Sequence, residues 1–395
     1  MLNHRLITKF ERTDDFIDAA INFIKKHSND KKIFCALSGG VDSSATYLLL
    51  KEANVNVFPY FIDHGLMRII NGVEERKYIK KLFPEVEILD IREDFLPKIY
   101  GEGNAEKKRQ LFKDAYSETI SKIIKDENYD LLADGTILPD IEESFGVSIS
   151  DLKETMTLEE ELRLLEKYKS GFVKSQHNLD IEYEVEATIQ PVASLTKPEV
   201  RKVLESFKMP QELVYRKAFP GPALAARIVG PVSEENLAFE KKIHDIVESS
   251  VNNYYLEQYG KSMIINKIGE QEPFQVFAAT IEDVINSKVT GLMDGKRIYK
   301  PPLCVSAKFD YNKLTKLATR VKVYARVFYF LGENIGGKYD VVIRSVNSTD
   351  ARTASVTNLP MDLLLKILSK ILNIPESRKI YFDVTPKPPA TIEYV

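Results

Sequence analysis

The stretch Ile33-Phe-Cys-Ala-Leu-Ser38-Gly39-Gly40-Val41-Asp42-Ser43-Ser44 decides the fold class of this 395-residue chain. Its opening run is apolar and contains β-branched and aromatic side chains, which predicts a short strand buried on both faces. The two consecutive glycines let the backbone turn sharply and come close to a ligand. The residues from Ala45 to Ala53 then predict a helix. A buried strand, a glycine turn and a helix in this order indicate an α/β domain with a ligand site at the turn.

The turn has the features of a phosphate site. Ser43 and Ser44 are expected where the first helical amides point outward unpaired, and these amides attract anions together with the helix dipole. Asp42 would repel phosphate unless a metal lies between them, and Mg²⁺ suits one carboxylate plus phosphate oxygens. The alternative is a turn that merely caps a helix, but the complete Ser-Gly-Gly-Val-Asp-Ser string favours the phosphate site. The spacing differs from that of kinase-type loops and of dinucleotide-binding motifs.

The composition is that of a globular protein, and it suggests neither a nucleic-acid partner nor a membrane partner. The formal net charge is -3, and Lys and Arg are scattered along the sequence. No apolar run approaches membrane-spanning length, and the first residues do not form a secretory leader. Cys35 and Cys304 each lie in an apolar run, so we expect reduced core cysteines rather than a disulfide. We therefore expect a cytoplasmic protein of two or three domains.

Further strands are expected at 56–63, 86–90, 129–133 and 189–192, with amphipathic helices between them. This alternation predicts right-handed crossovers and a parallel sheet. The ligand in such a sheet lies at the carboxyl ends of the strands, where the loop serines, Asp63 and Arg68 would converge. A polar helix over 150–169 is expected to be an insertion or a mobile lid.

The second half of the chain has a different character. The proline-glycine segment 219–224 marks the expected domain boundary. Beyond it, the patterns predict helices over 233–255 and 361–372 and strands over 274–281, 303–309, 339–346 and 379–384. These elements together form an α+β module.

The turn resembles the loop of the N-type ATP pyrophosphatases, which cleave ATP between the α and β phosphates and hold the departing pyrophosphate. Other motifs narrow the resemblance to the GMP synthetases, and they run in order over nearly the whole chain. These motifs are Ile62-Asp-His-Gly-Leu-Met-Arg68, Gly135-Thr136-Ile-Leu-Pro139-Asp140, Lys174-Ser-Gln-His-Asn178, Phe219-Pro-Gly-Pro-Ala-Leu-Ala, Arg344-Ser-Val-Asn-Ser-Thr-Asp-Ala-Arg-Thr-Ala354 and Thr385-Pro-Lys387-Pro-Pro-Ala-Thr-Ile392-Glu393.

The resemblance implies a fold of two domains. Residues 1–219 would form a parallel-sheet α/β domain of the adenine nucleotide alpha hydrolase-like (PP-loop) type, with a lid around 145–180. Residues 220–395 would form a smaller α+β domain for dimerisation and for binding xanthosine monophosphate (XMP).

The resemblance also implies a reaction in purine biosynthesis. In that family the 2-oxygen of XMP attacks the α-phosphate of ATP, and ammonia then displaces AMP from adenyl-XMP to give GMP. The implied ATP-binding residues are Ser38, Gly39, Gly40, Val41, Asp42, Ser43, Ser44 and Gly135, and Asp42 would also hold Mg²⁺. The implied XMP-binding residues are Arg68, Lys387, Ile392 and Glu393. The implied catalytic residues are Asp42 and, on a lid closing over the phosphates, Lys174 and His177.

Several motifs depart from the family pattern close to the implied active site. The usual His-Pro-Phe-Pro-Gly-Pro-Gly segment is Lys217-Ala218-Phe-Pro-Gly-Pro-Ala223 here, and the paired lid histidines are Gln176-His177. The usual Ala-Gln-Gly-Thr turn is Ala133-Asp134-Gly-Thr. Two alternatives to a divergent GMP synthetase therefore stay open. One is a relative that adenylates another nucleotide, and the other is a catalytically silent binding or regulatory protein.

The familiar form of the family also carries an N-terminal class I glutamine amidotransferase with a catalytic Cys and His. The residues before Ile33 are too few for such a domain, and neither cysteine is placed as its nucleophile. We therefore expect ammonia to come from solution or from a separate glutamine amidotransferase subunit. The resemblance of the second half to a dimerisation domain implies a homodimer, in which Lys387 would complete a site on or near the partner subunit.

Overall fold

The computed structural model describes residues 5–7, 16–28, 30–138, 140, 156–157, 184–260, 264–265, 271–272, 275–293, 295–348 and 353–394. The chain divides into two compact units. The first consists of Met1–Asp63, Ile79–Asp90 and Asp114–Arg216, and the second of His64–Tyr78, Ile91–Lys113 and Lys217–Val395. Residues 64–78 and 91–113, which the sequence placed in the first domain, thus group with the second unit.

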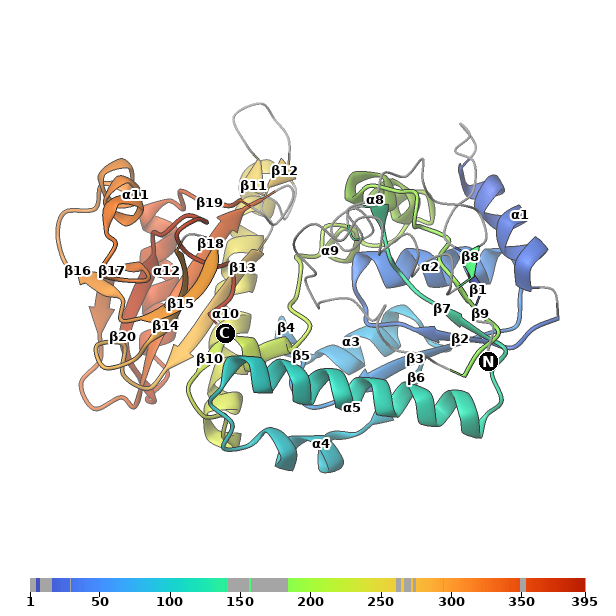
Figure 1. Ribbon diagram of the computed structural model, residues 1–395. Coiled ribbons are helices and arrows are strands. Elements are labelled where there is room, and N and C mark those ends of the chain that lie inside the picture. Colours follow the sequence, from blue (N-terminus) through green and yellow to red (C-terminus); the bar gives the residue numbers. More distant parts are fainter. Residues whose placement is uncertain are drawn as a thin grey trace. The chain divides into compact units, whose positions relative to one another are not determined.

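The first unit is built on one sheet with the strand order β6-β3-β2-β7-β9-β1-β8 (Figure 1). All neighbouring strands are parallel except β1 and β8, so the predicted parallel sheet is confirmed. Along the chain the strands are β1 Arg5–Ile7, β2 Ile33–Ala36, β3 Val57–Asp63, β6 Glu87–Asp90, β7 Leu131–Ala133, β8 Met156–Thr157 and β9 Ala187–Ile189. The rest of the expected lid lies outside the described residues.

Strand β2 lies inside this sheet, between β3 and β7. Its residues Ile33, Phe34 and Cys35 are at most 1% exposed, as expected for a strand buried on both faces. From β2 the chain first builds the sheet on the β3 side, and it later returns to place β7 on the other side. The carboxyl ends of β2 and β7 therefore form a topological switch point, which is where α/β sheets bind ligands.

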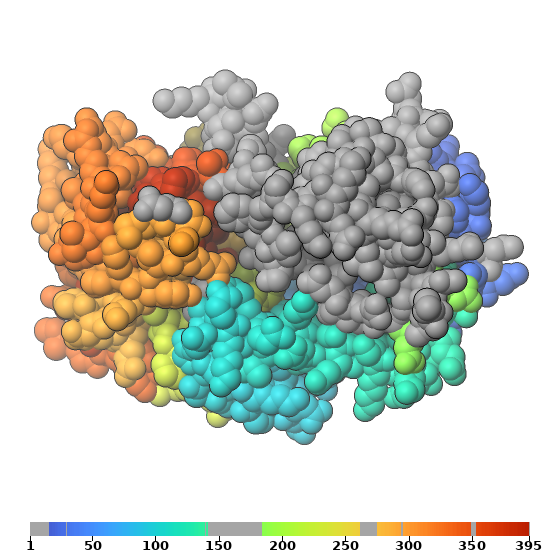
Figure 2. Space-filling model, viewed as in Figure 1, coloured from blue at the N-terminus to red at the C-terminus, as the bar shows by residue number. Residues whose placement is uncertain are grey.

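The helices before Lys217 include those expected between the strands, and α9 was not predicted. They are α1 Phe16–Ser28, α2 Val41–Glu52, α3 Glu75–Leu82, α4 Arg92–Ile99, α5 Ala105–Asp126, α8 Lys197–Ser206 and α9 Gln211–Val214. Helix α8 begins at a capping box, in which the Thr196 amide and hydroxyl donate to Glu199 at 2.8 and 2.6 Å. Helix α5 lies at the surface of the face shown in Figure 2. Every helix in the described ranges is too short or too polar to cross a membrane.

The second unit contains a mixed sheet with the strand order β10-β13-β18-β20-β17-β16, and β19 pairs with β18. These strands are β10 Ile228–Val229, β13 Gln275–Ile281, β16 Leu303–Val305, β17 Val327–Glu333, β18 Tyr339–Asn347, β19 Ser355–Val356 and β20 Ser377–Asp383. Three two-stranded hairpins are β4 Ile69–Ile70 with β5 Val73–Glu74, β11 Ile264–Ile265 with β12 Gln271–Glu272, and β14 Val289–Met293 with β15 Lys296–Lys300.

The two faces of this sheet are covered by different parts of the chain. On one face, α10 (Glu234–Tyr259) and α12 (Met361–Leu372) contribute Ile243, Val247 and Ile367 to a hydrophobic core (Figure 1). On the other face, Ile392 and Tyr394 of the C-terminal segment belong to a second core. The predicted α+β character is thus confirmed, and the C-terminal residues lie directly on the sheet.

Candidate active site

The glycine turn connects β2 to α2. Gly39 has a φ of +75°, and a Cβ atom there would lie 2.3 Å from Cδ1 of Ile79. Gly40 is the N-cap of α2, so the helix begins at Val41, earlier than expected. The Ser44 amide donates to the Gly40 carbonyl at 3.1 Å, and the expectation that this amide is unpaired is therefore wrong. The amides that a helix start leaves without an intrahelical partner belong to Val41 and the two residues after it.

The serine hydroxyls shape the turn. Ser38 Oγ lies 3.0 Å from Ser43 Oγ and accepts a bond from the Gly40 amide at 3.4 Å. Ser43 Oγ is also 3.3 Å from the Gly40 carbonyl oxygen. Ser44, in contrast, is fully buried behind the turn. The structure thus brings Ser38 and Ser43 together at the helix start, where an anion would be attracted.

Asp42 provides the carboxylate of the turn. Its Oδ2 atom is 2.6 Å from Nζ of Lys197, the first residue of α8. Its Oδ1 atom is buried and has no hydrogen-bond partner in the described part of the chain. The described residues also contain no group of three or more Asp, Glu, His or Cys side chains that could hold a metal. An orphaned carboxylate oxygen fits Mg²⁺, which proteins often hold with one carboxylate, phosphate oxygens and water.

Gly135 follows β7 and packs against the first turn of α2. A Cβ atom at Gly135 would lie 2.8 Å from the Ser43 nitrogen and 3.0 Å from the Asp42 carbonyl carbon. Backbone atoms cannot move aside as a flexible side chain can, so glycine is required here. The turns after β2 and β7 therefore meet at the switch point, as the sequence predicted for Gly135.

Arg68 lies in the second unit and is only 3% exposed. Its Nη1 atom is 3.0 Å from both carboxylate oxygens of Glu248 on α10, and its amide donates to Glu75 at 3.3 Å. The Nε atom is 3.7 Å from Glu75 and has no hydrogen-bond partner among the described residues. A buried guanidinium N–H without an acceptor is costly, and it marks a place where a ligand oxygen could bind.

Arg227 lies beside Arg68 in the same cluster and is 1% exposed. Its guanidinium stacks 4.9 Å from the Phe219 ring and 4.2 Å from the Phe277 ring, while Arg68 lies 4.6 Å from the Phe219 ring. Arg227 donates to both carboxylate oxygens of Glu393, at 3.3 and 3.4 Å. Phe219 of the proline-glycine segment therefore contacts both buried arginines.

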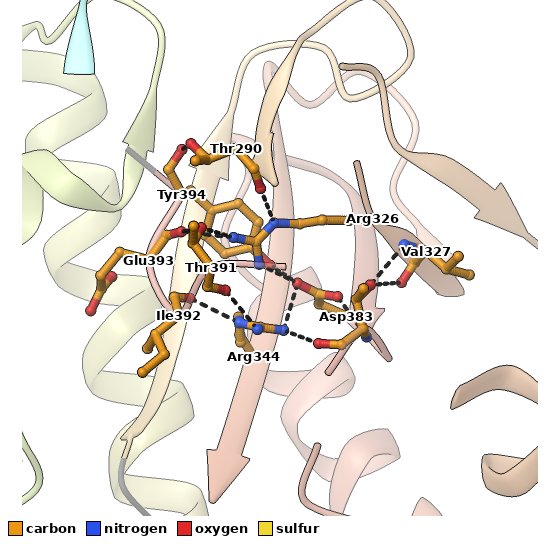
Figure 3. A network of polar contacts seen from close by, with 10 residues as sticks. Thr290, Arg326, Val327, Arg344, Asp383, Thr391, Ile392, Glu393 and Tyr394 are labelled. Atoms are coloured by element: carbon orange, nitrogen blue, oxygen red, sulfur yellow. Dashed lines mark hydrogen bonds and ion pairs between the residues drawn. The ribbon is translucent and has the colours of Figure 1, made fainter. Parts of the chain in front are cut away.

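The C-terminal segment that carries Ile392 and Glu393 is fixed by a buried polar network (Figure 3). Arg326 and Arg344 each lie 2.8 Å from Oδ2 of Asp383, at the end of β20. Both arginines also donate to the segment: Arg344 to the carbonyls of Thr385, Thr391 and Ile392, and Arg326 to Thr391 Oγ1 and the carbonyl of Glu393. The Nε atom of Arg326 donates to the Thr290 carbonyl on β14.

Lys387 lies on the same segment. Its backbone pairs with Ala354 in both directions, at 2.8 and 2.9 Å. The Ile392 side chain is 8% exposed and packs in the core, so the backbone of this residue is what the structure orients. One cluster of side chains thus links Arg68 to Glu393, while the position of Lys387 is fixed through its backbone.

The contacts within the cluster shift the pKa values of its members. Burial opposes the ionisation of Glu248, but Arg68 and His244 outweigh it and hold the pKa of Glu248 well below its ordinary value. Burial and the neighbouring Arg227 lower the pKa of His244 to about 4. Burial lowers the pKa of Lys217 to about 8. At neutral pH the cluster therefore contains an ionised Glu248, a neutral His244 and two guanidinium groups.

Several residues of both sites were not predicted from the sequence. Lys197 pairs with Asp42, and Arg216 donates to the Gly39 carbonyl. Arg227, His244 and Glu248 form the core of the cluster around Arg68. The sequence-predicted Lys174 and His177 lie outside the described residues.

Comparisons with known proteins give consistent results. A family model described as GMP synthase C terminal domain matches residues 330–394, and one described as tRNA methyl transferase HUP domain matches residues 31–79. A protein of Saccharolobus solfataricus, named as one of the subunits of glutamine-hydrolyzing GMP synthase, is 30% identical over 381 residues, which cover 94% of this chain and 96% of the relative. The protein of the same name from Methanocaldococcus jannaschii is 30% identical, covering 96% and 98%. GMP synthase (glutamine-hydrolyzing) of Pyrobaculum aerophilum is 30% identical over 97% of this chain but only 62% of its own length.

Proposed function

The chain belongs to the family of these GMP synthase subunits, and on this premise we propose that it adenylates XMP with ATP and that ammonia then displaces AMP to give GMP. It is an ATP-dependent ligase that forms C–N bonds. One observation supports the specific reaction most strongly. Arg68 and Glu393 lie far apart in the sequence, yet contacts within one buried cluster link them. The same polypeptide also carries the glycine turn that is suited to phosphate.

The turn after β2 is suited to the β and γ phosphates of ATP. The first amides of α2 and the positive end of its dipole would bind phosphate oxygens, and the glycines leave room for them. Asp42 would hold Mg²⁺ through its orphaned Oδ1, and the bound ion would neutralise phosphate charge. The α phosphorus would stay open to attack. The protein's task is then mainly positioning and charge neutralisation.

The cluster in the second unit is suited to XMP. The Arg68 Nε has no acceptor among the described residues, so it could bind a phosphate oxygen of the nucleotide. Glu393 could accept a hydrogen bond from a purine N–H, and Lys387 could supply a second positive charge. The carbonyl of Ile392 already accepts from Arg344, so this position would act through its fixed backbone.

Further parts of the proposal concern the lid and the partners. Lys174 and His177 would close over the reacting phosphates and exclude water from adenyl-XMP. A separate glutamine amidotransferase subunit would supply ammonia, in keeping with the names of the relatives, which describe one subunit of a glutamine-hydrolyzing enzyme. The chain would form a homodimer, with Lys387 on or near the partner's site.

The decisive experiment incubates the purified protein with ATP, Mg²⁺, ammonium and a panel of nucleotides that includes XMP. We expect AMP, pyrophosphate and GMP to form with XMP and with no other nucleotide of the panel. Pyrophosphate release with a different nucleotide, and not with XMP, would show that this other nucleotide is the acceptor. A folded protein that releases no pyrophosphate with any nucleotide would support a silent binding protein instead.

The matched variants are Asp42→Asn and Glu52→Gln. Asp42→Asn keeps the shape of the turn but removes the charge for Mg²⁺, and we expect pyrophosphate release to fall by at least about 100-fold. Glu52 is the exposed last residue of the same helix, so its neutralisation should leave the rate unchanged. Equal rates for both variants and the wild type would contradict the assigned role of the turn.

A further inference from the structure

Helix α10 carries three titratable side chains on successive turns of one buried face. Glu240 and His244 are 0% exposed, and the Glu248 side chain is 12% exposed. The spacing of four residues places them in one stripe along the helix. Burying such groups is expensive unless each is paired, so a buried polar stripe needs a reason beyond packing.

The stripe contacts two buried arginines, Arg68 and Arg227. Glu248 accepts from Arg68 at 3.0 Å and lies 2.9 Å from Nε2 of His244. Nη1 of Arg227 lies 3.1 Å from Nδ1 and 3.2 Å from Nε2 of the same ring, and Arg227 in turn donates to Glu393. An unbroken path of contacts therefore runs from Arg68 through Glu248, His244 and Arg227 to Glu393.

The tautomer of His244 follows from this path. The ionised Glu248 can only accept, so the ring proton must be on Nε2, which faces it, and Nδ1 is left as the acceptor for Arg227. The imidazole ring is thus neutral and has one hydrogen-bond donor and one acceptor. A positively charged imidazole would place an N–H against the guanidinium.

The same helix also holds the hairpin that follows Arg68. Asp245 accepts from the amides of Asn71 and Gly72, each at 2.8 Å. The backbone of the Arg68 hairpin and the Arg68 guanidinium are therefore both anchored on α10. The buried Arg68 Nε lies 3.7 Å from Glu75 but makes no hydrogen bond within the described ranges, so it could still donate to a ligand oxygen.

We infer that the stripe Glu240, His244 and Glu248 positions Arg68 and Arg227 for the nucleotide acceptor, and that the neutral His244 ring links the two arginines. This inference rests on the proposed function, because it assigns Arg68 and Glu393 to one nucleotide. The stripe residues are positioning residues and do not touch the substrate. Glu240 is linked to Arg227 through Thr280, whose hydroxyl donates to Glu240 at 2.6 Å and whose amide donates to the Arg227 carbonyl at 2.9 Å.

The test compares His244→Ala, His244→Gln and Glu248→Gln with the exposed control Glu257→Gln on the same helix. We expect His244→Ala and Glu248→Gln each to raise the KM for XMP by about tenfold, the scale of one hydrogen bond to a charged group, with kcat little changed. Glutamine at position 244 offers one donor and one acceptor, so His244→Gln should stay within about threefold of the wild-type KM. The control should match the wild type.

Equilibrium binding of XMP and the melting temperature are measured for every variant. A merely structural role would lower the melting temperature without changing the KM of the folded protein, and that result would overturn the inference. If His244→Ala does not fold, Glu248→Gln still decides, because a wild-type KM for this variant contradicts the assigned path. A wild-type protein that neither binds nor uses XMP would instead refute the proposed function.

Discussion

At the scale of single residues, His64 shows how burial fixes a protonation state. Its side chain is 3% exposed and packs with the rings of Phe95 and Phe112, whose centroids lie 5.9 and 4.8 Å away. Its Nδ1 atom accepts from the Leu66 amide at 3.2 Å, so the proton of the neutral ring is on Nε2. Burial lowers the pKa of His64 to about 3. The residue is therefore a neutral acceptor in the turn after β3.

This lowered pKa predicts acid sensitivity. The unfolded chain binds a proton at His64 below about pH 6.5, whereas the folded chain does not do so until about pH 3. The free energy of unfolding should therefore fall as pH decreases from 6.5, by up to about 1.4 kcal/mol per pH unit from this group. His64→Asn keeps an acceptor and removes the proton site, so urea unfolding at pH 5 and 7 should show a weaker pH dependence. His27→Asn, on α1, is the control, and an unchanged pH dependence in His64→Asn would contradict the argument.

Alanine substitutions of the glycines in the two turns should separate effects on stability from effects on activity. Gly135→Ala places a Cβ against backbone atoms of α2, and we expect a loss of about 1–3 kcal/mol in stability. Gly40→Ala meets only the Ser38 and Ser43 hydroxyls, at 3.4 and 3.9 Å, so the fold should tolerate it. The new methyl group would nevertheless crowd a phosphate. Melting curves and pyrophosphate release measure the two effects, and equal stability of both variants would argue against the close contact of the turns.

At the scale of elements, Asp383 at the end of β20 holds two buried arginines and Tyr394. Burial opposes the ionisation of this carboxylate, but Arg344 and Arg326 outweigh it, and the pKa of Asp383 lies below its ordinary value. The C-terminal segment with Glu393 depends on these arginines for its position (Figure 3). This network therefore couples the stability of the sheet to the position of Glu393 in the cluster around Arg68.

Asp383→Asn should thus be strongly destabilising. The change leaves two buried guanidinium groups without their anion, and breaking a buried ion pair in this way costs about 3–5 kcal/mol. Thermal unfolding followed by circular dichroism measures the loss. Glu235→Gln is the control, because the Glu235–Lys338 pair is exposed and its removal should leave the melting temperature unchanged. A melting temperature of Asp383→Asn equal to that of the control would contradict the structural role of the network.

Local sequence patterns predicted the elements well where capping and periodicity agree. Helix α12 was predicted with its observed bounds. The start of α2 was placed too late because Val41, Asp42 and Ser43 are weak helix formers in helix interiors, although Asp42 favours a first turn. The β14–β15 hairpin, β17 and α11 (Tyr311–Arg320) were not predicted, although α11 has an Asp310 N-cap and buries Leu314 and Ala318 at helical spacing.

The candidate sites were predictable only where a motif marks them. The turn after β2 and Arg68 stand in recognisable strings. The turn directly follows the predicted strand, whereas Arg68 lies beyond the end of β3 and belongs to the second unit. Lys197, Arg227 and His244 have no such local signal, because their roles depend on contacts with residues far away in the sequence. Buried charged side chains are rare, so their burial in a sheet or helix cannot be inferred from charge alone.

At the scale of the whole molecule, the two proposed substrates are assigned to different compact units. The turn proposed to bind ATP belongs to the first unit, while Arg68, Lys387 and Glu393, which are proposed to bind XMP, all belong to the second. Arg68 reaches the second unit because residues 64–78, which directly follow β3, group with it. A single segment after a core strand of one unit therefore contributes to the site of the other.

The source of ammonia gives the last prediction. A glutaminase of the amidotransferase type needs a reactive thiolate, and this chain has only two cysteines. Burial raises the pKa of Cys35, which is 1% exposed, and also that of Cys304 in β16, so both thiols are held in the unreactive form. We therefore expect the isolated chain to form GMP with ammonium and not with glutamine, and to release no glutamate. Cys304→Ser should keep the full ammonium-dependent rate, whereas glutamate release in step with GMP formation would show that the chain carries its own glutaminase activity.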